Sequence, residues 1–209
     1  MNLCAKPAHE IDLLVFDLGG VLVEWDGVEP LRKLSRRNLS REDARRFWLE
    51  SPWVRRFETG QCPPGSFAAG VVEELDLRLD AEGFLRDFIS WDRGPLPGAR
   101  ELLEELGRSC ELGCLSNNNE MHWSRLRDEF GFGHYFKYCF ISYEIGLLKP
   151  DREIFEFLLS HLPYPASRIA FFDDNPECVE SALELGIKAF QVQGIDEVRR
   201  VLGDLRLSG

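Results

Sequence analysis

Several reactive side chains stand directly after apolar runs of the sequence, in stretches that are far apart along the chain. These stretches are FDLGG with Asp17, LSNNN with Ser116 and Asn117, GLLKPD with Lys149, and FFDDN with Asp173 and Asp174. Carboxylates that lie close together repel one another, and their pKa values rise unless a cation sits among them. A hard dication such as Mg²⁺ prefers oxygen ligands and keeps part of its shell for water and phosphate. If these side chains converge, they predict a magnesium-dependent phosphoryl-transfer site.

Each of these residue types has its own use in that chemistry. Asp17 can attack phosphorus as a nucleophile and form an aspartyl phosphate. Ser116 and Lys149 can hold the transferring oxygens, and the charge of Lys149 also keeps Asp17 ionised. Taken singly, the stretches have simpler structural interpretations, such as Asp174 or Asn175 capping a helix, or a turn at Ser116. Their order and their common position after apolar runs favour a functional site.

The apolar runs themselves are typical of buried parallel strands. Residues 11–17 form a nearly continuous apolar run, as a central strand covered on both faces requires. Further strands are predicted at 111–117, 137–142, 167–174 and 187–192, and amphipathic helices at 99–108, 120–130, 151–162 and 176–186. This alternation predicts an α/β fold with a Rossmann-like, doubly wound parallel sheet, in which ligands bind beyond the carboxyl ends of the strands.

The segment 27–92 interrupts the alternation, because its pattern is helical throughout. Helices are predicted at 28–37, 40–50, 51–58, 63–77 and 80–91. Ser40 with Asp43 resembles an N-cap pair at the start of the second of these helices. The Pro and Gly residues of 93–99 are typical of a linker that returns the chain to the core. We therefore expect a Rossmann-like catalytic core formed by 1–26 and 93–209, with an inserted α-helical cap domain at 27–92.

The stretches FDLGGVL, LSNNN, GLLKPD and FFDDN, in this order, resemble the four motifs of the haloacid dehalogenase (HAD) superfamily. The helical insert resembles the small cap of one of its large subgroups. Within it, RFETGQCPPGSF resembles a cap segment of sugar-phosphate phosphatases of the glucose-1-phosphate phosphatase type. The resemblance spans the whole chain and implies a nucleophile at Asp17, phosphate or substrate binding by Ser116 and Asn117, a charge partner at Lys149, and a Mg²⁺ site formed by Asp17, the backbone carbonyl of Gly19, Asp174 and Asp173.

The sequence departs from the superfamily pattern at Gly19. Most phosphatases of the superfamily carry a second aspartate there, which protonates the leaving alkoxide and later activates water. Glycine can do neither. Glu24 and Asp26, just downstream, are candidate acids, although a solvated pair at the hinge is the simpler interpretation of both. A branch of sugar-phosphate phosphatases that resembles this chain also lacks the aspartate and still hydrolyses phosphates.

Two alternatives remain open on the residues alone. The haloacid dehalogenases also lack the second aspartate, because a halide needs no proton to leave. They use no metal, however, and they carry serine and asparagine at the positions that resemble Asp173 and Asp174 of this chain. The resemblance therefore favours a Mg²⁺-dependent phosphatase acting on a small phosphorylated metabolite, with a hexose phosphate as the first choice, over a metal-independent 2-haloacid dehalogenase. A catalytically impaired binding protein is the second alternative.

Composition excludes several other classes of function. The net charge of −11 disfavours nonspecific binding to nucleic acid or to a membrane surface, and no apolar run reaches the length of a membrane span. The first ten residues, which include Cys4, lack the pattern of a signal peptide, and the six cysteines are scattered. We expect a cytoplasmic protein with reduced cysteines. His122 is expected to be a packing or surface residue, and the oligomeric state cannot be read from the sequence.

Overall fold

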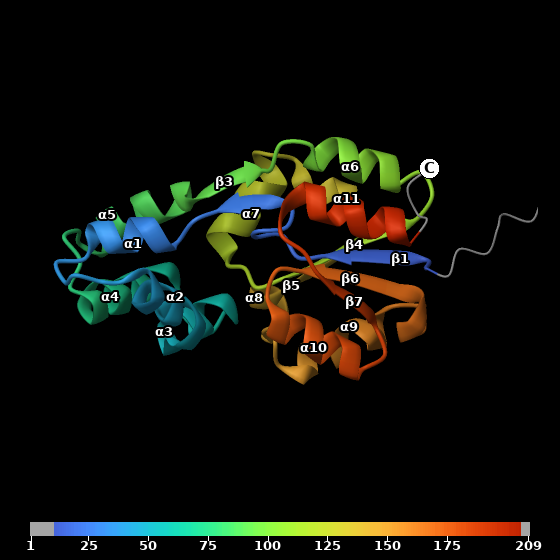
Figure 1. Cartoon of the computed structure of the whole chain (residues 1–209). Coiled ribbons are helices and arrows are strands. Elements are labelled where there is room, and N and C mark those ends of the chain that lie inside the picture. Colours follow the sequence, from blue (N-terminus) through green and yellow to red (C-terminus); the bar gives the residue numbers. More distant parts are fainter. Residues whose placement is uncertain (1–10, 206–209) are drawn as a thin grey trace, which may run out of the picture.

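A five-stranded parallel sheet forms the centre of the molecule (Figure 1). The structure is a computed structural model that describes residues 11–205, so the expectation for the first ten residues lies outside the described part. The order of the strands is β5-β4-β1-β6-β7, and every neighbouring pair is parallel. Their bounds are β1 (Leu13–Phe16), β4 (Glu111–Ser116), β5 (Tyr138–Ile141), β6 (Ile169–Asp173) and β7 (Lys188–Gln191). These strands confirm the predicted doubly wound α/β core.

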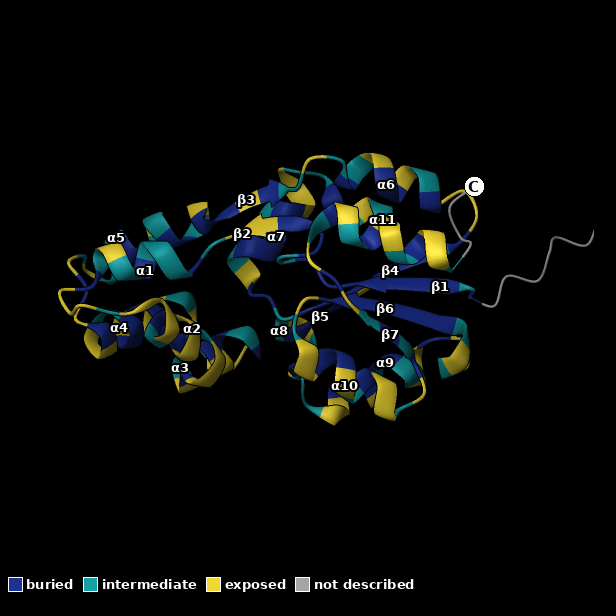
Figure 2. Cartoon of the chain, viewed as in Figure 1, coloured by how far each residue is buried: buried dark blue, intermediate teal, exposed yellow. Residues whose placement is uncertain are grey.

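Helices cover both faces of the sheet, which explains the continuous apolar run of β1. Leu14 and Phe16 pack into a core with the helices of one face, and Leu13 and Val15 pack into a core with the helices of the other. Figure 2 shows β1 and β6 at the centre of the sheet as buried, with exposed positions gathered on the outer sides of the helices. The first face carries α6 (Ala99–Leu106), α7 (Glu120–Asp128) and α11 (Gly194–Asp204), and the second carries α9 (Arg152–His161) and α10 (Pro176–Glu184).

The inserted segment folds as a separate layer of helices with a core of its own, beyond one end of the sheet (Figure 1). Aromatic rings dominate this core; for example, Phe57 stacks on Phe67 with ring centroids 4.2 Å apart. The predicted cap of the second helix is confirmed, because Ser40 and Asp43 form a reciprocal capping box. The helices are α1 (Val28–Leu34), α2 (Arg41–Glu50), α3 (Pro52–Glu58), α4 (Pro64–Leu75) and α5 (Ala81–Phe88).

Two short strands join the helical cap to the core. β2 (Val23–Trp25) and β3 (Asp92–Pro95) pair antiparallel, so the first residues of the segment predicted as a return linker form a strand that was not predicted. No local pattern indicated β3, because Gly94 and Pro95 are typical of loops and the strand that pairs with β3 lies far away in the sequence. The helix α11 was also not predicted. The remaining short elements are η1 (Ile89–Trp91), η2 (Phe132–Tyr135), α8 (Ser142–Ile145) and η3 (Ala166–Arg168).

No helix within residues 11–205 is long and apolar enough to cross a membrane.

Candidate active site

The parallel sheet brings the predicted strand-end residues to one edge. Asp17 follows β1 directly, and its backbone N–H donates to Phe172 O of β6 at 2.8 Å. Asp173 is the last residue of β6, and Ser116 is the last residue of β4. Since β1 pairs with both of these strands, the three side chains belong to neighbouring positions at the carboxyl ends of the central strands. All three residues are buried, so the site is built into the sheet.

Lys149 reaches this edge from the loop between α8 and α9. Its Nζ atom lies 2.9 Å from Asp17 Oδ1 and 2.6 Å from Asp173 Oδ2. The ammonium group therefore bridges the ends of β1 and β6. The side chain of Lys149 is 3% exposed, so both ion pairs are removed from bulk water.

Asn117 fixes the backbone of this lysine. Its side-chain Nδ2 donates to Lys149 O, and its Oδ1 accepts from Lys149 N, both at 2.8 Å. The loop that follows β4 is held further along by Ser142, whose hydroxyl accepts from Asn118 N and donates to Asn118 O at 2.9 Å. The amide of Asn117, predicted as a substrate ligand, thus uses its oxygen and one of its two N–H donors to position Lys149.

Burial and like charges shape the ionisation of the site. Burial raises the pKa of Asp17 to about 7; Lys149 opposes this rise, whereas Asp173 and Asp174 add to it. Burial disfavours the ammonium form of Lys149, but Asp17 and Asp173 outweigh that effect and raise its pKa. The pKa of Asp174 is raised as well, by burial and then by Asp173. Lys149 alone therefore does not offset burial and the repulsion between the carboxylates, and an additional cation would lower the pKa values of Asp17 and Asp174.

Asp17, Asp173 and Asp174 each offer a carboxylate oxygen, and these atoms lie within 4.8 Å of one another. Asp174 is the exposed member of the three. It lies against Gly20, where an added Cβ would stand 2.4 Å from Asp174 Oδ2. The oxygen donors and the excess of negative charge both fit a hard dication such as Mg²⁺.

The helix that follows β6 is capped by a neighbour of the acidic pair. Asn175 Oδ1 accepts from Glu177 N at 2.9 Å, and the backbone N–H of Asn175 donates to Asp173 Oδ1 at 2.8 Å. The helix-cap interpretation of FFDDN therefore holds for Asn175. Asp173 uses one oxygen in this turn and the other on Lys149, which leaves the carboxylate of Asp174 the more accessible of the two.

The weaker sequence candidates lie in structural positions. Glu24 is exposed and pairs with Arg93 across β2 and β3 at 2.6 Å. Asp26 Oδ1 accepts from the backbone N–H groups that open α1. His122 is buried and packs beside Phe88, whose carbonyl lies 2.9 Å from His122 Nε2. The expectation of a packing role for His122 is confirmed.

Sequence reasoning missed one carboxylate, Glu58, which is the last residue of α3 in the cap. It is half-buried, and burial raises its pKa to about 8; Asp17 adds to the rise and Lys149 opposes it. A carboxyl group of the inserted helices thus belongs to the electrostatic environment of the strand-end cluster. No periodicity marks this glutamate, because it sits at the end of a short helix.

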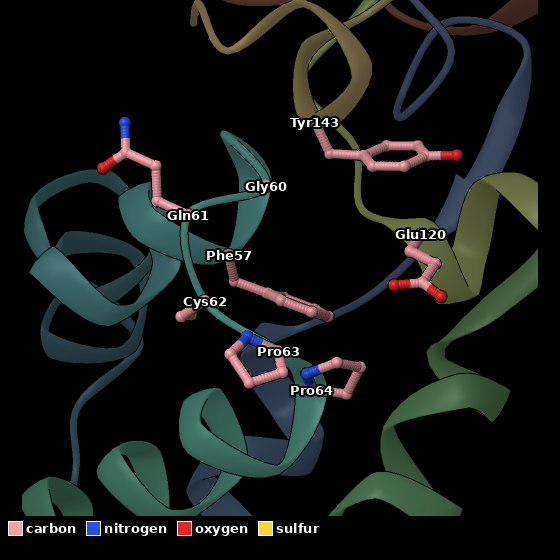
Figure 3. A pocket seen from close by; sticks show the side chains of 8 residues that line it. All are labelled: Phe57, Gly60, Gln61, Cys62, Pro63, Pro64, Glu120 and Tyr143. Atoms are coloured by element: carbon pink, nitrogen blue, oxygen red, sulfur yellow. The ribbon is translucent and has the colours of Figure 1, made fainter.

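A pocket of about 350 Å³ lies between the cap and the core beside this helix (Figure 3). Phe57 of the cap and Tyr143 of α8 face each other across it, and the carboxylate of Glu120 approaches from α7. The rest of the wall comes from the cap turn at Gly60, Gln61, Cys62, Pro63 and Pro64. The mixture of rings, an amide and a carboxylate suits a small polar molecule.

The chain belongs to the family of haloacid dehalogenase-like hydrolases, whose profile matches residues 11–186. Among curated relatives, it is 27% identical to a phosphatase of Mycobacterium tuberculosis over 201 residues, which cover 90% of each chain. It is 25% identical to the D-ribitol-5-phosphate phosphatase of Bacteroides thetaiotaomicron over 201 residues, 90% of this chain and 95% of the relative. The resemblance found in the motifs is thus confirmed.

Solved structures agree with this family assignment. A HAD family enzyme from Bacteroides thetaiotaomicron, in complex with magnesium and inorganic phosphate, matches with a TM-score of 0.72 and 26% identity, over 88% of this chain and 94% of the other. The L-2-haloacid dehalogenase from Xanthobacter autotrophicus matches with a TM-score of 0.63 and 23% identity, over 87% and 77%. The second likeness shows a shared fold alone. The chain is therefore a hydrolase of the HAD fold with a helical cap.

Proposed function

We propose that this protein is a magnesium-dependent phosphatase that hydrolyses a small phosphorylated metabolite through an aspartyl-phosphate intermediate. The observation that carries the proposal is the buried Lys149, held between Asp17 and Asp173 beside the exposed carboxylate of Asp174. Two relatives that match along almost their whole length are named phosphatases. A related structure holds magnesium and inorganic phosphate.

The acidic cluster provides the proposed metal ligands. Asp17 and Asp174 would contribute carboxylate oxygens directly, because Asp173 already shares its two oxygens with Lys149 and the Asn175 backbone. The backbone carbonyl of Gly19 is the further protein ligand that we propose. A bound Mg²⁺ would supply positive charge next to the phosphoryl oxygens. The paired acids favour this chemistry over metal-free dehalogenation.

Asp17 carries the covalent chemistry in this proposal. Its carboxylate attacks phosphorus in line, forms the aspartyl phosphate and releases the alcohol portion of the ester. Water then attacks phosphorus, breaks the bond to Asp17 and releases inorganic phosphate. Lys149 and the Ser116 hydroxyl balance and hold the phosphoryl oxygens, and Asn117 keeps Lys149 in place through its backbone.

The cap would select the substrate. We propose the boundaries 27–92 for this domain, inserted between the core segments 1–26 and 93–209. The pocket beside α3 and α8 has the size and the polar lining for the body of a sugar or sugar-alcohol phosphate, with a hexose phosphate as the first candidate. Closure of the cap would exclude bulk water from the reacting phosphate.

Phosphate release tests the proposal directly. Wild type and Asp17→Asn are compared on a panel of sugar phosphates, ribitol phosphate and p-nitrophenyl phosphate, with Mg²⁺ and with EDTA. We expect release that EDTA and the substitution both abolish, while circular dichroism shows the variant folded. Turnover of a haloacid without metal contradicts the phosphatase in favour of a dehalogenase. Inactivity toward every substrate favours a binding protein.

A further inference from the structure

The proposed reaction lacks a proton donor at its usual place. An alkoxide is a poor leaving group, and its protonation in the transition state is typically worth about 10²–10⁴-fold in rate. Gly19 has no side chain that could supply this proton. Its backbone does not require glycine: φ is not in the left-handed region, and the nearest atom to an added Cβ is Trp25 Cβ at 4.0 Å. Conformation therefore does not explain the missing acid.

The end of α3 is anchored both in the cap and on the core loop that carries Lys149. Phe57 is buried in the cap core, and the hydroxyl of Thr59 donates to Arg55 O at 2.7 Å, so the backbone on both sides of Glu58 is fixed. Toward the core, Arg55 Nη2 lies 2.5 Å from Asp151 Oδ2, two residues after Lys149. This ion pair ties the helix to the loop that carries the site lysine.

The turn after α3 touches the core even more closely. A Cβ added at Gly60, where φ is +68°, would stand 2.5 Å from Tyr143 O of α8. Phe57 and Gly60 both line the pocket between cap and core. Glu58, between them in the sequence, therefore lies on the part of the cap that packs against the core beside this pocket.

The carboxyl group of Glu58 has no hydrogen-bond or ion-pair partner among residues 11–205. Asp17 raises the pKa of Glu58 and Lys149 lowers it, and neither residue forms a direct ion pair with Glu58. The described residues contain no fully buried side-chain oxygen without a partner, so the carboxyl oxygens of Glu58 are accessible from outside the protein. The carboxyl group is therefore available to a bound substrate.

We propose that Glu58 is the general acid and base of the reaction, supplied by the cap in place of the side chain that is absent at Gly19. This assignment rests on the proposed phosphatase function. In the first half, the Asp17–phosphorus bond forms, the phosphorus–oxygen bond of the ester breaks, and Glu58 gives its proton to the departing oxygen. In the second half, water attacks phosphorus, the bond to Asp17 breaks, and the water proton goes to the Glu58 carboxylate, which restores the acid.

The ionisation of Glu58 agrees with this role. A pKa of about 8, raised by burial and by Asp17, keeps the group protonated at neutral pH, as a proton donor requires. Because the donor belongs to the cap, the complete set of catalytic groups exists only when cap and core are together. Substrate selection and catalysis are then coupled through one helix end.

Leaving-group dependence tests the assignment. Single-turnover release of the alcohol is measured for Glu58→Gln with a hexose phosphate and with p-nitrophenyl phosphate, whose anion leaves without a proton. We expect release from the hexose phosphate to fall about 10²–10⁴-fold and release from the aryl ester to fall less than about tenfold. Equal slowing of both esters, or no slowing of the alkyl ester, overturns the assignment. Glu50→Gln, at the exposed end of the neighbouring helix α2, is the matched control and should match wild type.

Two further measurements keep the assignment testable. In Glu58→Gln, rapid quenching should show accumulated aspartyl phosphate after the aryl burst, since water activation is also lost; its absence counts against the base role. If this variant does not fold, rates of wild type on a series of esters with different leaving alcohols test the assignment. A steep dependence of the rate on the basicity of the alcohol would mean that no acid assists and would overturn it.

Wild-type hydrolysis of the aryl ester, sensitive to EDTA and to Asp17→Asn, tests the phosphatase itself. Its failure overturns both proposals, whereas equal slowing by Glu58→Gln overturns only the second.

Discussion

Replacement of Lys149 by methionine removes the ammonium group that bridges two buried carboxylates, those of Asp17 and Asp173. Its Nζ lies 2.9 Å from Asp17 Oδ1 and 2.6 Å from Asp173 Oδ2. At an effective dielectric constant of about 20, each contact corresponds to about 6 kcal/mol of gross attraction. Desolvation of the ammonium offsets much of this, and loss of one member of a buried ion pair typically costs about 3–5 kcal/mol. We expect Lys149→Met to lower the free energy of unfolding by that amount in EDTA.

The pH dependence of this loss has a definite sign. Lys149 opposes the rise in the pKa of Asp17 that burial causes, so its removal raises that pKa above about 7. Above about pH 7, Asp17 of the variant must either stay charged in a buried position or bind a proton, and both lower the stability of the folded state. Near pH 5, Asp17 is neutral in both wild type and variant. The penalty of Lys149→Met should therefore be largest at about pH 8 and smaller at about pH 5. Excess Mg²⁺ should restore part of it, because the ion supplies charge to the same carboxylates.

Urea unfolding, followed by circular dichroism at both pH values, measures this effect. Lys33→Met, on the exposed side of α1, is the matched control and should change stability by less than about 0.5 kcal/mol. A loss below about 1 kcal/mol for Lys149→Met at about pH 8 in EDTA would refute the reasoning, since it would place the ion pairs in the range of solvent-exposed pairs.

Two further predictions concern the loop after β1 and the helix α7. Gly20→Ala places a Cβ 2.4 Å from Asp174 Oδ2 at a φ of +76°, so it should weaken Mg²⁺ binding in calorimetry and cost about 1–3 kcal/mol of stability. Gly146→Ala, at a φ of +81° with open space around it, isolates the backbone cost; equal Mg²⁺ affinity in the Gly20 variant and wild type contradicts the prediction. Burial lowers the pKa of His122 to about 4, and stability present above the unfolded pKa of about 6.5 is lost as pH falls. Between about pH 7.5 and pH 5, wild type should lose about 2 kcal/mol more than His122→Gln in urea unfolding, and an equal loss would exclude this role.

The strand-end residues were predictable because topology alone brings them together. A continuous apolar run such as that of β1 requires a sheet covered on both faces, and parallel strands end at a common edge. Asp17, Ser116 and Asp173 each follow such a run, so their convergence follows from the alternation of strands and helices. The position of Lys149 does not follow from strand ends alone, because the side-chain amide of Asn117 holds the backbone of its loop.

The pairing of β2 with β3 and the helix α11 were not predicted. The two strands are short, they carry Gly94 and Pro95, and they pair across the whole inserted segment, so neither contains a local pattern of its own. The cap helices were predictable because their apolar positions repeat with the helical period, and because Ser40 and Asp43 mark a helix start.

The sequence by itself determined the α/β core, the helical insert and the reactive residues at the strand ends, because hydrophobic periodicity and the succession of strands and helices along the chain can be read locally. Only the tertiary structure decided how Glu58 relates to Asp17 and Lys149. That relation depends on the packing of the turn after α3 against Tyr143 of α8, a contact between distant segments. Such a contact is set by the shapes of two folded surfaces, and no spacing of residues along the chain encodes it.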